Sequence, residues 1–205
     1  MLHSKFDLSL FEENIYTEFQ PPYGKTLQVK ALKTDAQGAG SLKKTLGVAK
    51  IKTCDYISIN ENKIFMIEIT DLKRQEDDLE WLLMALKQKL CPVDTNNQRF
   101  CVKSEALRIE KSFKAKDLIF SELRQKCIET TLLVHKIADR ENFLYTEKFE
   151  NKNFIIVIKE MTPSEAPAMQ SLEVKLRSAL TDIVDLVRVI PQDNLEGFLT
   201  KAANS

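Results

Sequence analysis

The sequence predicts a mixed α/β protein, in which a central mixed β-sheet contains a hairpin and is flanked by helices. Two β-prone runs, residues 48–60 and 63–70, are separated by only two residues, as in a hairpin. Leucines recur at helical spacing between residues 79 and 90. A fully apolar run at 154–158 precedes a helical pattern and then another β pattern. Strands separated by helices in this way indicate a sheet with helices on its faces.

The composition is that of an ordinary globular chain. The 205 residues are 43% hydrophobic and 29% charged, which predicts one domain over residues 1–205. The 30 basic and 30 acidic residues give no net charge, so the global basic excess typical of nucleic-acid-binding proteins is absent. The four cysteines lack metal-ligand spacing, and neither a signal peptide nor a run of about 18 apolar residues is found. We therefore expect a cytoplasmic protein that has no membrane segment.

The first quarter of the chain is expected to form a helix and a strand. Residues 6–19 have the pattern of a short amphipathic helix, which the Pro21-Pro22 pair ends because proline favours extended backbone before it. Residues 27–32 alternate apolar and polar side chains and predict a strand. The glycines at 38 and 40 lack the spacing of a phosphate-binding loop, so we expect only a flexible joint there.

The hairpin places two acids opposite each other. A turn centred between residues 61 and 62 pairs Ile57 with Met66 and Asp55 with Glu68, and the alternation of side chains puts both acids on one face. Two facing carboxylates repel unless a cation or a proton lies between them. Mg²⁺ takes oxygen ligands and is often held by one or two carboxylates. The pair therefore predicts a site for Mg²⁺ or Mn²⁺, although a lysine or arginine partner for Glu68 is an alternative.

The rest of the chain supplies the other helices and strands. After the helix at 79–90, which Pro92 ends, the patterns predict a long helix at about 104–140, a strand at 154–158, a helix capped by Ser164, a strand at 183–190 and a short helix at 195–199. The long helix either covers the sheet or forms a homodimer through its apolar stripe.

The acid pair resembles the core motif of a known superfamily. A strand with Asp, a short turn, an apolar strand with Glu and a following helix are similar to the restriction-endonuclease-like, or PD-(D/E)xK, nucleases. Here the motif reads Cys54-Asp55-Tyr56 and Ile67-Glu68-Ile69-Thr70. The resemblance covers residues 41–92, and residues 154–190 fit the remainder of the αβββαβ core. It implies a restriction-endonuclease-like core with residues 104–140 as a long helical insertion.

The resemblance also implies an activity and a set of catalytic residues. The activity is metal-dependent hydrolysis of nucleic-acid phosphodiester bonds, with Asp55 and Glu68 as metal ligands. An acid of the first helix, Glu12 or Glu13, is the candidate third ligand.

The chain departs from the family pattern two residues after Glu68. The family usually has a lysine there, which stabilises developing negative charge, whereas this chain has Thr70. We expect Lys73, one helical turn further on, to act as the catalytic cation, with Lys50 and Lys52 as alternatives. Thr70 is equally compatible with a degenerate member that binds without cutting.

Local charge suggests where a nucleic acid would bind. Between Lys25 and Lys52 the chain has seven lysines and a single acid, Asp35, so this segment is expected to contact phosphates, with DNA as the expected partner.

The sequence is also compatible with two other functions. One is a catalytically inactive protein of the nuclease fold that acts as a protein–protein or nucleic-acid interaction module. The other is an unrelated α/β regulatory protein.

Overall fold

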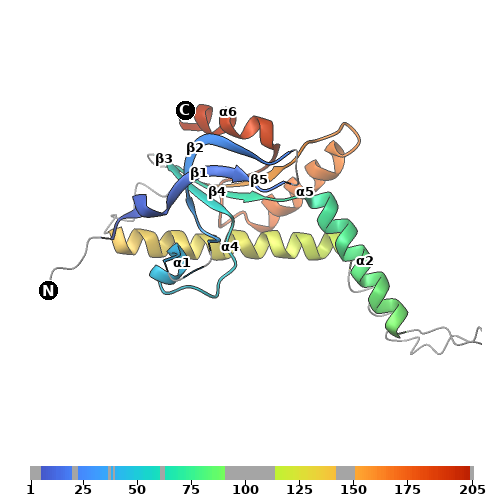
Figure 1. Cartoon of the computed structure of the whole chain (residues 1–205). Coiled ribbons are helices and arrows are strands. Elements are labelled where there is room, and N and C mark those ends of the chain that lie inside the picture. The colour runs from blue at the N-terminus through green and yellow to red at the C-terminus, as the bar shows by residue number, and fades with distance from the viewer. Residues whose placement is uncertain are drawn as a thin grey trace, which may run out of the picture. The chain divides into compact units, whose positions relative to one another are not determined.

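The computed structural model describes residues 6–19, 23–36, 38, 40–60, 63–90, 114–141 and 151–203. Its centre is one sheet of six strands, which lie side by side in sequence order (Figure 1). The strands are β1 (Glu12–Thr17), β2 (Lys25–Lys33), β3 (Tyr56–Asn60), β4 (Lys63–Ile69), β5 (Asn151–Ile158) and β6 (Leu186–Pro191). Strands β1 to β4 are antiparallel, whereas β5 and β6 run parallel to β4. The predicted mixed α/β fold with a central mixed sheet is therefore confirmed.

The chain divides into two compact units. The helical elements are a 3₁₀ turn (Leu8–Phe11), α1 (Leu42–Thr45), α2 (Leu72–Leu90), α4 (Ala115–Glu141), α5 (Ala166–Ala179) and α6 (Gln192–Ala203). The first unit comprises Met1–Thr70 with Arg124–Ser205, and the second is Asp71–Leu123. The first unit holds the sheet, α1, α5, α6 and most of α4. The second holds α2 and the start of α4. Residues 91–113, which include residues 104–113 of the predicted insertion, lie outside the described residues.

Each face of the sheet is covered by a helix of the first unit (Figure 1). On one face, Tyr56, Phe65 and Ile67 form a core with Leu195 and Leu199 of α6. Because side chains alternate along a strand, Met66 and Glu68 face the other way, toward α4. There the Thr131 hydroxyl contacts the Met66 sulfur at 3.6 Å. The apolar run predicted as a central strand is β5, whose residues from Asn153 to Ile158 are all buried.

The N-terminal segment is a strand, so the prediction of a helix over residues 6–19 is wrong. Only a 3₁₀ turn at Leu8–Phe11 is helical, and β1 then pairs with β2. In β1, Ile15 and Thr17 are buried while Tyr16 between them is exposed, which is the period of a strand. A short segment with ambiguous periodicity takes the structure that its long-range partner provides, and here that partner is β2.

The hairpin has the predicted register but a shorter first strand. Asn60 pairs with Lys63 and Ile57 with Met66, as expected, and the turn residues 61 and 62 lie outside the described residues. Residues 48–55, predicted as strand, are not in the sheet, because β2 pairs with β3 only at Tyr56 and Ile57. The chain reaches β3 through Gly47, which has a φ of 74° that suits glycine.

The helices after the hairpin differ from prediction at their ends. Helix α2 begins at Leu72, earlier than the predicted 79. Helix α5 has Glu165 at its N-cap position in place of Ser164.

Most apolar residues of α4 are buried within the chain, and Leu132 is the one large apolar residue of its described part that is strongly exposed. A homodimer through α4 stays a prediction. None of the described helices is long and apolar enough to span a bilayer.

Candidate functional site

Asp55 and Glu68 lie at the same end of neighbouring strands. Asp55 immediately precedes β3, and Glu68 is the penultimate residue of β4. The observed register, continued by one residue, sets the two positions opposite each other. The Asp55 side chain lies against the end of β4, since its Oδ2 accepts a hydrogen bond of 2.7 Å from the Ile69 N–H. This bond fixes the Asp55 carboxylate at the edge of the strand pair.

Glu68 is buried beneath α4 and is paired with a lysine of that helix. The residue is only 2% exposed, and its Oε1 lies 2.5 Å from Nζ of Lys126. The Lys126 side chain is itself mostly buried. Taking a carboxylate and an ammonium out of water is costly, and a close ion pair offsets much of that cost. The lysine partner considered as an alternative in the sequence is therefore present, although it comes from a segment 58 residues further along the chain.

Lys126 also acts on Asp55. The pKa of Asp55 is raised from 3.8 to about 6; burial is the largest cause of the rise, and the Ile69 N–H and the positive charge of Lys126 act against it. The charges of Asp35 and Glu18 raise it further. One lysine thus lies within electrostatic range of both predicted metal ligands.

Asp55 also lines a small polar cavity. A small cavity of about 50 Å³ is lined by Asp55 and Ile69 together with Tyr16, Glu18, Lys33, Asp35 and Tyr56. Asp55 therefore lies within electrostatic range of Lys126 and also lines a mixed-charge cavity. Of the two acids, Asp55 is the more accessible to solvent.

Lys33 organises this cavity through several contacts. Its Nζ lies 3.4 Å from carboxylate oxygens of Glu13 and of Glu18, and 3.9 Å from Asp35. It also donates to the Tyr56 hydroxyl at 3.2 Å. Burial by itself would lower the pKa of Lys33, but Tyr56 and the acids raise it above its ordinary value. This lysine is therefore a fixed cation that already has its counter-charges.

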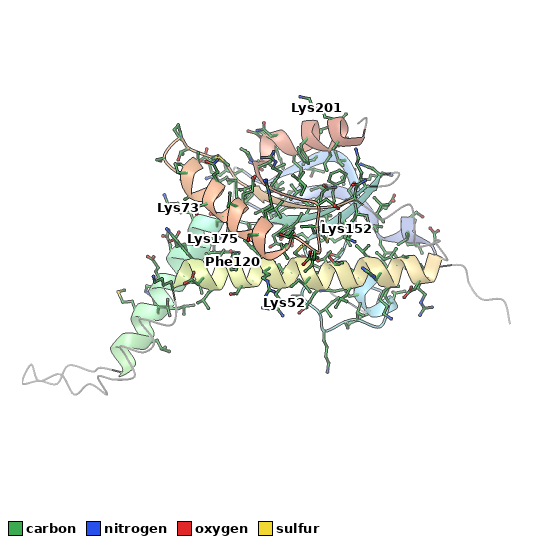
Figure 2. The ribbon with its side chains drawn as sticks, turned by 180° about the vertical axis from the view of Figure 1, so that it is seen from behind. Lys52, Lys73, Phe120, Lys152, Lys175 and Lys201 are labelled. Carbon is green, nitrogen blue, oxygen red and sulfur yellow. The ribbon has the colours of Figure 1, made fainter. Side chains whose placement is uncertain are left out.

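The other predicted site residues lie in different places. Lys73 is in the first turn of α2 (Figure 2). It belongs to the second unit, whereas Asp55, Glu68 and Lys126 belong to the first. Thr70 is buried directly after β4. Within the first unit, the cation that pairs with Glu68 is Lys126.

The alternative cations and the third acid are also located. Lys50 and Lys52 are exposed on the connection before β3, where Figure 2 labels Lys52. The main-chain N–H of Lys52 donates to a carboxylate oxygen of Glu129 in α4. Glu12 is exposed on the edge strand β1. Glu13 bonds the Tyr56 hydroxyl at 3.1 Å and belongs to the Lys33 cluster.

Sequence reasoning missed Lys126, although the sequence carries a signal for it. In α4 the buried residues Leu123, Cys127 and Thr130 mark the face that packs inward. Lys126 is three residues after Leu123 and four before Thr130, so helical periodicity places it on that same face. A lysine on a buried helical face needs a buried acid as its partner.

The donor set suits a hard cation more than a soft one. The described residues contain no group of three or more His, Cys, Asp or Glu side chains arranged to hold a metal. Two carboxylates fit Mg²⁺ or Mn²⁺, which commonly take one or two protein ligands and complete their shell with water and phosphate oxygens. They do not fit a closed structural zinc site, which takes four protein ligands.

Comparison of this chain with protein-family models, with curated proteins and with solved structures found no match.

Proposed function

We propose that this protein is a divalent-metal-dependent nuclease in which Asp55 and Glu68 bind the ion. Lys126 supplies the positive charge that the nuclease family usually takes from a lysine at the position of Thr70. The observation that carries the proposal is the 2.5 Å contact between Lys126 and Glu68, next to Asp55. Two acids and one cation are the residue types that phosphodiester hydrolysis of this kind needs. This set assembles from three separate elements: the residue before β3, strand β4 and helix α4.

Each residue has a distinct role in the proposed reaction. When bound, the metal ion would polarise the phosphodiester and lower the pKa of a water molecule. Asp55 accepts the Ile69 N–H through Oδ2, which fixes its carboxylate at the end of β4, where it would bind the ion. Glu68 would exchange its contact with Lys126 for the ion. The released ammonium of Lys126 would then stabilise the negative charge that develops on the phosphate.

The basic connection before β3 is the proposed contact for nucleic-acid phosphates. Of the lysines between Lys25 and Lys52, Lys25 bonds Asp193 and Lys33 is enclosed by acids. Residues 36–54 carry four lysines and no acid. Three of these lysines, at 44, 50 and 52, are exposed and form no ion pair within the described residues. This connection leads directly to Asp55, so phosphates bound along it would reach the acid pair.

Cleavage of plasmid and single-stranded DNA in Mg²⁺ or Mn²⁺ tests the proposal. The wild-type protein should cut, and Asp55→Ala and Glu68→Ala should each remove cutting while circular dichroism shows a folded protein. Asp182→Ala, at an exposed position distant in sequence, is the matched control and should cut normally. Absence of cutting by folded wild-type protein with either ion, on DNA and on RNA, would refute the proposal.

The burial of Glu68 favours a second candidate, a non-catalytic interaction module. A buried ion pair is also a structural element, and in that case Glu68 would never bind a metal. Thermal unfolding in Mg²⁺ or Mn²⁺ separates the two functions, because an ion that binds only the folded state raises its stability. With the ion at about ten times its Kd, the gain is about 1.4 kcal/mol. Stable DNA binding without such a gain and without cutting would favour the module.

A further inference from the structure

Buried polar groups that make no hydrogen bond gather near the acid pair. Within the described residues, the hydroxyls of Thr53 and Thr70 and one carboxylate oxygen of Asp35 are shielded from solvent and make no hydrogen bond. Thr53 comes two residues before Asp55, and Asp35 lines the cavity beside Asp55. Thr70 comes two residues after Glu68. Because a buried polar group without a hydrogen bond costs free energy, native proteins keep few of them, and those they keep call for a functional explanation.

Thr70 extends from the same face of the sheet as Glu68. Its N–H donates to the Val157 carbonyl at 2.9 Å, so the hydrogen-bond ladder between β4 and β5 continues through Thr70. Side chains alternate along a strand, so the side chains of Glu68 and Thr70 both leave the face that α4 covers. Thr70 is only 3% exposed, and its hydroxyl is therefore a buried polar group beside a proposed metal ligand.

The spacing of the two side chains suits a hydrogen bond to the water shell of an ion. Two residues of a strand rise about 6.6 Å, which separates Thr70 from Glu68 along β4. Mg²⁺ lies about 2.1 Å from its oxygen ligands and usually keeps several water molecules. From the Glu68 carboxylate, through the ion and one of its waters, a hydrogen bond reaches an oxygen at most about 7 Å away. The Thr70 hydroxyl is within that range.

We propose that the Thr70 hydroxyl binds a water molecule of the metal ion's shell and holds it beside Glu68. This inference rests on the proposed function, since it requires the ion. Lys126 contacts Glu68 at the position that the ion would take, and an ammonium group is similar in size to a water molecule. Its departure from Glu68 therefore makes room for water on this face. Thr70 acts on the ion only through that water, which makes it a positioning residue.

The Thr70 hydroxyl should have opposite effects on stability and on metal affinity. Thr70→Val keeps nearly the same shape and removes the buried group that makes no hydrogen bond, so the urea midpoint of the protein without metal should rise. The same substitution removes a hydrogen bond to the ion's water, and the loss of such an outer contact weakens metal binding about tenfold or more. Thr70→Ser retains the hydroxyl and should retain most of the metal affinity.

Titration calorimetry with Mn²⁺ and urea unfolding in the presence of a chelator, both on the full chain, test this inference. Thr17→Val is the matched control. Thr17 is also fully buried, but its hydroxyl bonds the Gln192 side chain at 2.8 Å and the Lys25 carbonyl at 3.2 Å. Thr17→Val should therefore lower the urea midpoint, because it leaves those partners unpaired, and should bind Mn²⁺ as the wild type does.

The possible results separate this inference from the proposed function. Wild-type protein that binds Mn²⁺, with Thr70→Val binding it equally well, would refute the role of Thr70 and leave the proposed nuclease standing. Folded wild-type protein that binds no Mn²⁺ would refute both. A lower urea midpoint for Thr70→Val without metal would show that the hydroxyl has a partner within the chain, which also refutes the inference. Equal loss of Mn²⁺ affinity in Thr70→Val and Thr70→Ser would assign the effect to packing and overturn the role of the hydroxyl.

Discussion

Replacement of Asp55 by Asn should stabilise the protein above pH 6 and remove metal binding. The carboxylate of Asp55 is held in a site whose burial favours its neutral form, as its pKa of about 6 indicates. Asparagine has nearly the same shape, is neutral at every pH, and retains an oxygen that can accept the Ile69 N–H. The substitution thus removes the buried charge and leaves the geometry in place.

The expected magnitude follows from the pKa. A rise from 3.8 to about 6 corresponds to about 3 kcal/mol of unfavourable free energy for the charged form, which is the upper limit of the gain. The Ile69 N–H bonds a carboxylate more strongly than a neutral amide, so a gain of about 1–2 kcal/mol is expected at pH 8. Between pH 4 and 6 the folded wild-type protein binds more protons than the unfolded chain. Its free energy of unfolding therefore falls as pH rises through that window.

Urea unfolding at pH 4, 5, 6 and 8 measures this effect. The stability difference between Asp55→Asn and wild type should be smallest at pH 4, grow up to pH 6 and then level off. The exposed control Asp182→Asn should stay within about 0.5 kcal/mol of wild type throughout. A variant that is less stable than wild type at pH 8, or a difference that does not change with pH, would refute the reasoning. Added Mn²⁺ should stabilise wild type and leave Asp55→Asn unchanged.

Three further substitutions test other parts of the structure. Lys126→Met should lower the free energy of unfolding in urea by about 3–5 kcal/mol, because it leaves the Glu68 carboxylate buried without its partner. Adding Glu68→Gln should recover much of that loss. Equal stability of Lys126→Met and wild type would disprove the pairing. Gly47→Ala should cost about 1–2 kcal/mol, since its φ of 74° disfavours a side chain, and an unchanged midpoint would contradict that conformation. If Lys44 and Lys50 both contact phosphates, the double substitution Lys44→Gln, Lys50→Gln should make the plot of log affinity for duplex DNA against log salt concentration less steep by about 2. An unchanged slope would exclude this connection as the DNA contact.

Parts of the fold that depend on local pattern could be predicted from the sequence. The apolar run at 154–158 is buried on both faces as β5, because a run without polar residues has no face to offer to water. The register of β3 and β4 followed from the two-residue spacing of the hairpin, since a short turn permits few pairings. The helices of the C-terminal half also followed from periodicity, with errors only at their ends.

The tertiary structure decided the features that depend on distant partners. Residues 12–17 became β1 because β2 lies beside them, although their own pattern also suits a helix. The cation at the acid pair is Lys126, which follows Glu68 by 58 residues in the chain and reaches it because α4 packs across the sheet. The sequence by itself therefore determined the mixed α/β class and the neighbouring positions of Asp55 and Glu68. Which charge faces Glu68 was set only by folding, because burial forces a carboxylate to pair with whichever cation the packing of another element brings to it.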